Sequence, residues 1–503
     1  MLIRILILSL FTTLCFGDCN FDEITKLLKC NNIKAEAIVS KYFNVKQNVA
    51  RIYWENCEIT KLEANVVPFE QTQFLKISCG IREINPNTFV RVNNIIELDL
   101  SNNKISRITN QMFDNLSNLE RLNLNKNVLR NPPREAFTKI AKLKELNLSQ
   151  NRITNIGTAV LDMPKLQNLY LNNNGIFVLL ADTFEELRNA KIIDISNNDI
   201  PDLSGVFNYT KDLEVLKLSN NPVQKIDVHL FKVATLLKEL DMSNCQLDNL
   251  QLEAFTGINN LEKLKFSNNP IKQIQQGLFE QMTKLQEISI SNISISSLTT
   301  TTFQNNNMLN KLDLSNNQLS NLDEGIFANT QLEYLNVSNN KLELFRENLF
   351  RNRRLKVLDL SNNGFENIDV LVNQPLQMLY VRGNKIDYIG PQTLPRSLEY
   401  LDITENRLIY IEDSLFEQMP KLRMLEFLGN PLACACFNNI LTALSNKSIS
   451  FTKGNYFDGI SSFCVVYETF HCVIKRQELK KFYYQYELIK NDVLLDTVYF
   501  RNN

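Results

Sequence analysis

The sequence predicts a repeat solenoid of the α/β class, and three observations support this prediction. One phrase, apolar-x-x-apolar-x-apolar-x-x-Asn-x-apolar, returns seventeen times between Val49 and Leu432. A phenylalanine recurs in the segment that follows the phrase, and cysteines gather at the two ends of the chain. A period of roughly 20 to 50 residues is the signature of a solenoid, because each copy buries its apolar face only against its neighbours.

The first 17 residues have the composition of a secretory signal peptide. Arg4 precedes an apolar run that extends to Phe16, and Gly17 is a small residue suited to a cleavage site. An uncleaved anchor is the alternative. No later stretch reaches the roughly 18 apolar residues of a spanning helix, and the polar end, residues 499–503, does not match a lipid-anchor signal. The mature chain is therefore expected to be secreted and soluble, without a membrane span.

The rest of the chain divides into an N-terminal cap over residues 18–48, repeats over 49–433, a cysteine-rich C-terminal cap over 434–475 and a tail over 476–503. In the N-terminal cap, Cys19 and Cys30 are expected to pair. The seventeen copies begin at Val49, Thr72, Ile95, Leu119, Leu143, Leu166, Ala190, Leu213, Leu237, Leu261, Leu285, Leu309, Leu332, Leu355, Leu376, Leu398 and Leu422.

Each copy is expected to begin with a short strand, as in Leu98-Asp99-Leu100. Its fourth and sixth residues point inward and its third and fifth point outward, and strands of successive copies stack in parallel. The Asn at the ninth position predicts a ladder of buried amides that satisfies backbone groups at the turn. Cys245 takes this position in one copy and is expected to be a buried structural thiol. Ile293 also takes it and cannot hydrogen-bond, which predicts a local irregularity or a buried water.

A phenylalanine near the nineteenth position predicts a stacked aromatic core along the return segments. Its members are Phe113, Phe137, Phe184, Phe231, Phe255, Phe279, Phe303, Phe327, Phe350 and Phe416.

These features resemble extracellular leucine-rich repeat proteins such as Toll-type receptor ectodomains, Slit, chaoptin and connectin. The resemblance covers residues 49–472 and implies a horseshoe with a parallel concave sheet and disulfide-bonded N- and C-terminal caps. The end sequence from Asn430 to Cys436 is similar to the start of the family's C-terminal cap, which implies that Cys434 pairs with Cys464 and Cys436 with Cys472. Many such caps have a tryptophan shortly afterwards, whereas residues 440–444 have none, so this cap is a variant.

Two further features have alternative interpretations. Cys57 and Cys79 both occupy the ninth position of adjacent copies, where stacked residues are close enough to bridge, or where two reduced thiols can serve the ladder. In the tail, apolar residues recur at helical spacing over residues 477–489. This segment is expected to cover the open end of the solenoid, and dimerisation is the alternative.

The composition argues against catalysis and against nucleic acid. Only His229 and His471 are present, neither with partners that would make a catalytic group, and no cofactor or metal motif is found. A formal net charge of −1 lacks the basic excess that nucleic acid or an anionic membrane requires. Acidic residues recur at the fifth position and form a column that fits a basic partner or a cation. A solvated face, interleaved with Lys217 and Lys265, is the favoured interpretation. The column comprises Asp99, Asp194, Asp241, Asp313, Asp359, Asp402 and Glu426.

The most informative change is at the third position, which also faces outward. From the copy at Ile95 to the copy at Leu309 it is mostly charged or polar, and in the next five copies it becomes apolar and aromatic. The predicted partner-binding residues are Tyr334, Val357, Met378, Tyr400 and Met424 at the third position, with Tyr380 at the fifth. A contiguous apolar stripe with Tyr and Met is typical of an interface, and strand propensity is the alternative explanation.

The sequence also predicts N-glycosylation sites and a general function. Six sequons are present, at Asn115, Asn147, Asn208, Asn292, Asn336 and Asn446. The expected function is non-enzymatic recognition of a protein or glycan partner in innate immunity, with self-association through a dimer as one possibility. A role in cell adhesion or developmental signalling is the alternative.

Overall fold

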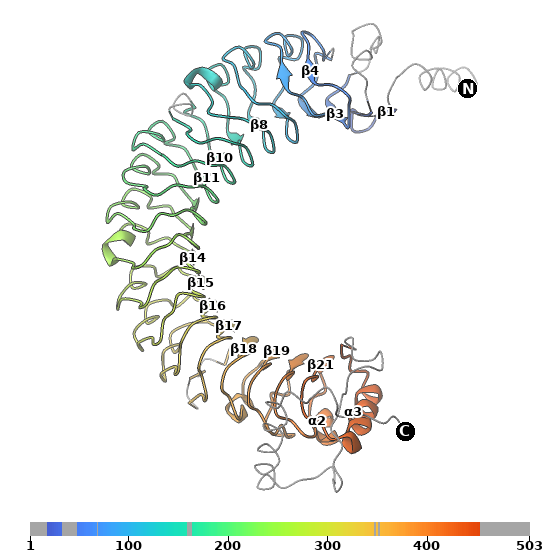
Figure 1. The fold of residues 1–503 in the computed structure, drawn as a ribbon, viewed down its shortest axis with the longest axis vertical. Coiled ribbons are helices and arrows are strands. Elements are labelled where there is room, and N and C mark those ends of the chain that lie inside the picture. The colour runs from blue at the N-terminus through green and yellow to red at the C-terminus, as the bar shows by residue number, and fades with distance from the viewer. Residues whose placement is uncertain are drawn as a thin grey trace, which may run out of the picture. The chain divides into compact units, whose positions relative to one another are not determined.

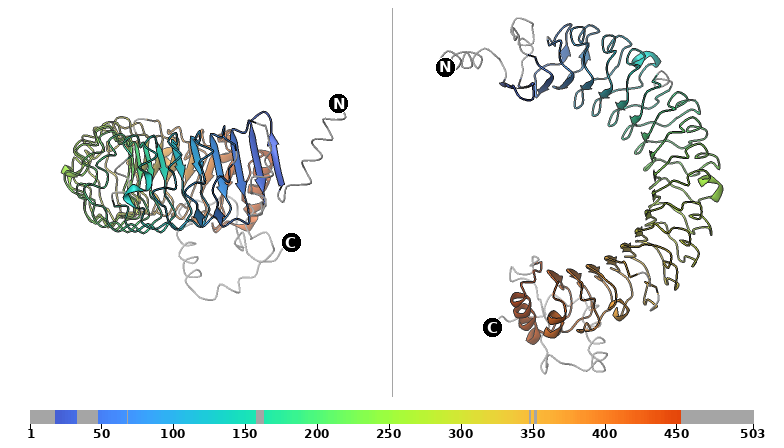
Figure 2. Two further views of the ribbon diagram at one scale, coloured as in Figure 1. Left: turned by 90° about the horizontal axis from the view of Figure 1, so that it is seen from above. Right: turned by 180° about the vertical axis from the view of Figure 1, so that it is seen from behind.

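The computed structural model describes residues 18–32, 48–67, 69–157, 163–346, 349–350 and 353–452. The chain divides into two compact units, Met1–Asn269 and Pro270–Asn503, and each is a stack of repeats (Figure 1). The views in Figure 2 show that the strands of a unit lie side by side along one face, with the return segments behind them.

In the first unit, a hairpin precedes the repeats. Strands β1 and β2 are antiparallel, and β2 pairs in parallel with β3. Every later pair of the described strands in this unit is parallel and in register, as in Leu98 with Leu122. The strands are β1 (Asp18–Asp22), β2 (Leu27–Asn31), β3 (Arg51–Glu55), β4 (Lys61–Leu62), β5 (Phe74–Ser78), β6 (Glu83–Ile84), β7 (Glu97–Asp99), β8 (Arg121–Asn123), β9 (Glu145–Asn147), β10 (Asn168–Tyr170), β11 (Ile192–Asp194), β12 (Val215–Lys217), β13 (Glu239–Asp241) and β14 (Lys263–Lys265).

The second unit continues the same parallel arrangement from copy to copy. Its strands are β15 (Glu287–Ser289), β16 (Lys311–Asp313), β17 (Tyr334–Asn336), β18 (Val357–Asp359), β19 (Met378–Tyr380), β20 (Tyr400–Asp402) and β21 (Met424–Glu426). Among the described residues, the helices are the short 3-10 helices η2 (Arg134–Phe137), η3 (Leu252–Phe255) and η4 (Asp369–Leu371), and the α-helices α2 (Asp413–Gln418) and α3 (Cys434–Asn446). Most described return segments are turns, so the parallel sheet is the main regular element of the fold.

The predicted inward and outward positions are confirmed. In β7 to β20 the middle residue, at the fourth position of its copy, is buried, and the residues at the third and fifth positions are at least partly exposed. The phenylalanine core is also confirmed, because these side chains are buried and neighbouring rings contact one another. The centroid distance is 5.6 Å between Phe279 and Phe303 and 6.2 Å between Phe303 and Phe327.

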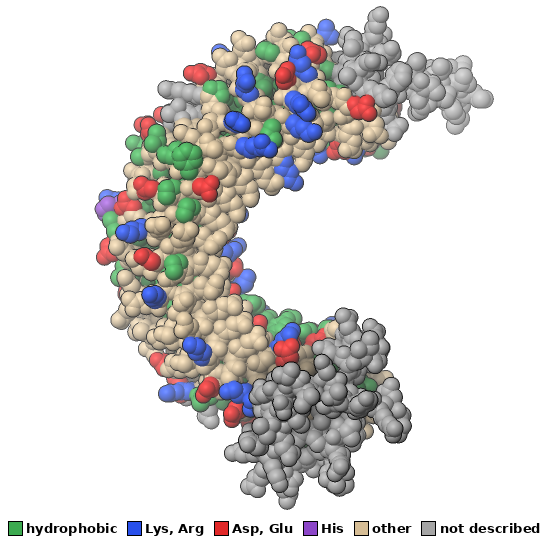
Figure 3. Space-filling view, in the orientation of Figure 1, with side chains coloured by type: hydrophobic (Ala, Val, Ile, Leu, Met, Phe, Trp, Pro, Cys, Tyr) green, Lys and Arg blue, Asp and Glu red, His purple; other side chains and the backbone are tan. Residues whose placement is uncertain are grey.

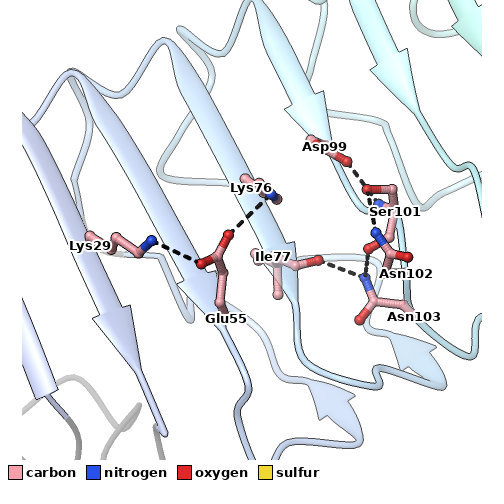
Figure 4. Close-up of polar contacts among 8 residues, drawn as sticks. All are labelled: Lys29, Glu55, Lys76, Ile77, Asp99, Ser101, Asn102 and Asn103. Carbon is pink, nitrogen blue, oxygen red and sulfur yellow. Dashed lines mark hydrogen bonds and ion pairs between the residues drawn. The ribbon is translucent and has the colours of Figure 1, made fainter. Parts of the chain in front are cut away.

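The asparagine ladder is confirmed in detail. Nδ2 of Asn103 donates to the carbonyls of Ile77 at 2.6 Å and of Leu100 at 2.8 Å, and its Oδ1 accepts from backbone N–H groups of the preceding copy (Figure 4). The residue just before the ladder position, such as Asn102 with φ of 57°, has a left-handed backbone. Asn tolerates this conformation better than most residues, so the frequent Asn-Asn pair makes both the turn and the ladder.

Copies without a ladder Asn share one hydrogen-bond arrangement. Ile293 is fully buried, and its backbone N–H donates to Oδ1 of Asn317 at 3.1 Å, while Ile295 donates to the same oxygen at 3.3 Å. At Cys245, the following Asn269 accepts two N–H groups in the same way. The amide of the next copy thus accepts the backbone N–H of Ile293 as well as that of Ile295, which is two hydrogen bonds in place of the usual one.

Candidate binding surface on the second unit

The six predicted partner-binding residues lie together on the sheet face of β17 to β21. Backbone register places Tyr334 beside Val357, Met378 beside Tyr400, and Tyr400 beside Met424. Tyr380 is in the adjacent row, between Asp359 and Asp402. We call this set of six residues the aromatic stripe.

All six side chains of the aromatic stripe are half-buried. The rings of Tyr380 and Tyr400 contact each other across the two rows, with centroids 5.0 Å apart and planes tilted by 39°. At the other end, Nζ of Lys311 lies 5.6 Å from the ring centroid of Tyr334. Figure 3 shows hydrophobic side chains near acidic and basic ones along the strand-bearing edge of this unit. The backbone register and the contact of Tyr380 with Tyr400 therefore place the stripe as one continuous row on the sheet face.

The acidic column at the fifth position has a structural role that the sequence reasoning missed. In each copy the aspartate Oδ1 accepts the backbone N–H of the residue two positions later, as in Asp99 with Ser101 at 2.9 Å (Figure 4). Asp359 and Asp402 do the same, each at 2.9 Å. Such a turn ends the strand, and the recurring Asp-x-Ser or Asn-x-Ser pattern is the signal that could have revealed it.

The charges on this face differ between the copies. In the first unit, acids at the third and fifth positions stand beside bases: Asp241 lies between Lys217 and Lys265, and Arg121 contacts Glu97 at 2.7 Å. From β17 to β21 the same positions hold Asp359, Asp402 and Glu426 and no base. No ion pair of the described residues includes an aspartate of the acidic column, so the two regions differ in the bases that stand beside these aspartates.

The N-terminal end of the first unit provides a contrast on the same sheet face. Glu55 lies between Lys29 and Lys76, each 3.1 Å away, and hydrogen bonds from these two lysines lower the pKa of Glu55 (Figure 4). The rings of Tyr53 and Phe74 contact each other there, with centroids 5.0 Å apart. Sequence reasoning did not find this group, in which lysines of the chain neutralise the carboxylate beside an aromatic pair.

Burial affects the ionisation of the stripe tyrosines and of Asp359 beside them. Burial raises the pKa of Asp359, hydrogen bonds from Ser361 partly offset this rise, and the negative charges of Asp402 and Asp313 raise the pKa further. Burial, with the carboxylates of Asp402 and Glu426 nearby, raises the pKa of Tyr400 to about 12. Tyr380 has a raised pKa mainly through burial, with contributions from Asp359 and Asp402. The phenols therefore remain protonated at physiological pH and can donate hydrogen bonds.

We expect Asp359→Asn to stabilise the protein at neutral pH. Asn336, at the same position in the neighbouring copy, accepts the N–H of Ser338 at 2.9 Å, so Asn preserves the turn. Because the folded-state pKa of Asp359 is raised, its contribution to stability is fully present below its ordinary pKa. That contribution is lost as the pH rises through the folded-state value. The expected gain at pH 7 is about 0.5 to 1 kcal/mol, after allowance for solvent screening.

The measurement is urea unfolding at pH 7 and near pH 3, where the two proteins should converge. Asp194→Asn is the matched control, since Asp194 makes the same turn with Ser196 but lies beside Lys217. A loss of stability at pH 7 in Asp359→Asn would contradict the burial argument.

The predicted disulfide residues are only partly within the described chain. The structure contains the disulfides Cys19–Cys30 and Cys57–Cys79, so the second pair is a bridge and not two reduced ladder thiols. Cys436 is disulfide-bonded, while Cys464 and Cys472 lie outside the described residues, as does the side chain of Cys434. Cys245 is a free buried thiol, and burial raises its pKa to about 12, which suits the structural role expected of it.

The six sequons fall in different environments. Asn208, Asn292 and Asn446 are exposed, and Asn115, Asn147 and Asn336 are half-buried. Asn147 and Asn336 accept the backbone N–H of the sequon serine in the strand-ending turn. Asn336 is also next to Tyr334 and in register with Asp359, so a glycan there would lie beside the aromatic stripe.

Other predicted features lie partly outside the described chain. The signal segment 1–17, most of the C-terminal cap and the tail 476–503 are in this category, as is His471. Among the described residues, no His, Cys, Asp and Glu side chains group as a metal site would require. In the same part of the chain, no helix combines the length and the apolar character needed to cross a bilayer.

Two repeat-family models match the chain. The model described as a leucine rich repeat matches residues 77–129, 117–176, 164–223 and 374–432. The model described as a BspA type leucine rich repeat region, in six copies, matches residues 224–356. Together with the stacked parallel strands and the asparagine ladder, these matches show that the chain is a leucine-rich repeat protein. In a sequence comparison with curated proteins, the chain has no match.

Solved structures share this fold. A chain of the glycosylated Drosophila Toll–Spatzle complex is 20% identical, with a TM-score of 0.69 over 85% of this chain and 68% of that one. The ectodomain of the Arabidopsis thaliana receptor kinase GASSHO1/SCHENGEN3 is 24% identical, with a TM-score of 0.60 over 77% and 48%. A Leptospira interrogans leucine-rich repeat protein is 20% identical, with a TM-score of 0.55 over 85% and 89%. At these identities the likeness concerns the fold alone.

Proposed function

We propose that the chain is a secreted, non-enzymatic recognition protein that binds a protein partner through the aromatic stripe. The observation that carries this proposal is the stripe itself. Six half-buried apolar and aromatic side chains adjoin on one sheet face, in a register fixed by β17 to β21. Tyr and Met are enriched in the cores of interfaces, and a rigid surface loses little side-chain entropy when a partner docks.

Two structural neighbours support a protein as the partner. One is the complex of Toll with Spatzle, described as a hub in Drosophila development and innate immunity. The other is the Arabidopsis receptor kinase ectodomain in complex with Casparian strip integrity factor 2. The disulfides of the first unit support an extracellular setting, since such bonds persist in oxidising compartments.

Innate immunity is the biological setting that we propose. Developmental signalling is the second candidate, because the description of the Toll–Spatzle complex names both processes. A binding assay distinguishes the two settings: binding of the chain to microbial material favours innate immunity, and binding to tissue surfaces favours developmental signalling.

The test compares capture from the extracellular fluid of the source organism by immobilised wild-type and variant proteins. The double variant Tyr380→Glu/Tyr400→Glu introduces charge on the stripe and should fail to retain a protein that the wild type retains. Tyr170→Glu is the matched control, because Tyr170 occupies the fifth position of β10, with Glu145 and Asp194 nearby. Equal capture by the folded double variant would refute binding through the stripe.

A further inference from the structure

We propose that the partner contacts the aromatic stripe with a basic side chain, Arg or Lys, set beside an apolar one. The cation would lie against Tyr380 and Tyr400, between the carboxylates of Asp359 and Asp402. This inference rests on the proposed function and specifies the chemistry of the partner's contacting segment.

The first argument is the free hydrogen-bonding capacity of the two carboxylates. Oδ1 of Asp359 accepts a hydrogen bond from the N–H of Ser361. Oδ1 of Asp402 accepts hydrogen bonds from the N–H and the hydroxyl of Thr404. Among the described residues, the hydrogen bonds to Asp359 and Asp402 come only from Ser361 and Thr404 of their own turns. Each carboxylate therefore keeps lone pairs that can accept from a guanidinium or ammonium group.

The second argument is the position of these carboxylates around the aromatic pair. Register places Asp359 and Asp402 on either side of Tyr380, and the ring of Tyr380 contacts that of Tyr400. A cation above a tyrosine face is attracted by the ring, and two flanking carboxylates add to that attraction. Lys311 above Tyr334 shows the same type of contact on this sheet face, made there within the chain.

The third argument is charge complementarity. Elsewhere on the sheet face the chain supplies its own cations, as Lys29 and Lys76 do for Glu55. From β17 to β21 the third and fifth positions contain no base, and Glu426 is instead bonded to Thr452. An acidic segment would be repelled there, and a neutral glycan would leave the two aspartates uncompensated. A basic segment with an apolar neighbour satisfies both the carboxylates and the half-buried stripe.

The experiment uses a random dodecapeptide library displayed on phage as the probe. Peptides are selected on the immobilised wild-type chain and depleted on Tyr380→Glu/Tyr400→Glu, so that only stripe-dependent sequences remain. We expect these sequences to carry Arg or Lys next to an aliphatic or aromatic residue. Synthetic copies should then bind Asp359→Asn/Asp402→Asn roughly tenfold or more weakly than wild type, by calorimetry.

The matched control is Asp194→Asn/Asp241→Asn, which changes two aspartates at the same position that make the same turns. Its affinity should stay within about twofold of wild type. Asn336 and Asn147 accept the same backbone hydrogen bond in the equivalent turns of their own copies, so both double variants should fold.

Three outcomes would overturn the inference: stripe-dependent peptides without basic enrichment, equal binding to Asp359→Asn/Asp402→Asn, or no stripe-dependent peptide at all. The first two would leave the proposed function intact, because the peptides would still require the tyrosines. Failure of the proposed function is seen separately, as capture of a natural partner that does not depend on Tyr380 and Tyr400.

Discussion

Replacing Asn317 with alanine should destabilise the second unit by about 3 to 5 kcal/mol, more than the same change at an ordinary ladder position. Nδ2 of Asn317 donates to the carbonyls of Ile290 and Leu314, both at 2.9 Å. Its Oδ1 accepts two backbone N–H groups, from Ile293 and Ile295. Alanine would leave these two N–H groups and the Ile290 carbonyl without a partner, while the Leu314 carbonyl keeps its hydrogen bond from Asn340.

Asn340→Ala is the matched control. Nδ2 of Asn340 makes equivalent bonds to Leu314 and Val337 at 3.0 Å, but its Oδ1 accepts only the N–H of Leu319. Its expected cost is about 2 to 3 kcal/mol. Urea unfolding followed by circular dichroism measures both variants, and hydrogen exchange over residues 290–319 locates the loss. Equal destabilisation would mean that the second hydrogen bond, from the N–H of Ile293, contributes nothing to stability.

Removing the Cys57–Cys79 disulfide should destabilise the start of the repeat stack by about 3 kcal/mol, as expected for a bond that closes a loop of this length. The two cysteines are 22 residues apart and join adjacent copies, the first of which has the cap hairpin as its other neighbour. In a stack of repeats, each copy is stabilised by its neighbours, so an end copy loses structure first.

The variant is Cys57→Ala/Cys79→Ala, and hydrogen exchange over residues 51–79 is the measurement. Exchange there should accelerate strongly, while residues 215–241 in the same unit keep their protection. Cys245→Ala is the control for loss of a buried sulfur without loss of a bridge. Unchanged exchange at residues 51–79 would show that parallel pairing of β3 with β5 suffices to hold this end.

The regular part of the fold could be predicted because its cause is repeated in every copy. Apolar residues at the fourth and sixth positions, Asn at the ninth and Phe near the nineteenth each have one dominant physical role in a stack. The structure places Leu98, Asn103 and Phe113 accordingly. Where a residue breaks the pattern, as Ile293 does, the sequence shows the missing group. The additional hydrogen bond from the N–H of Ile293 to Asn317 depends on the position of the next copy and becomes visible only in the structure.

The candidate surface could be predicted in composition but not in contacts. The third-position change to Tyr, Val and Met is visible in the sequence, and the strand period places those residues on one face. The diagonal contact of Tyr380 with Tyr400 depends on side-chain conformation across neighbouring copies. The use of Asp359 and Asp402 in the turns was also missed, since each accepts the N–H of the residue two positions later and still has lone pairs for a partner.

Hydroxyl-radical footprinting of the chain with and without its captured partner tests the central claim most directly, since Tyr and Met side chains report on their own exposure. Binding through the stripe predicts that Met378, Tyr380, Tyr400 and Met424 become protected. Tyr170, and Tyr209, which is 39% exposed, should be labelled as in the free chain. Protection at Tyr170 or Tyr209 with no change at Met378, Tyr380, Tyr400 and Met424 would contradict the account and place the binding surface elsewhere.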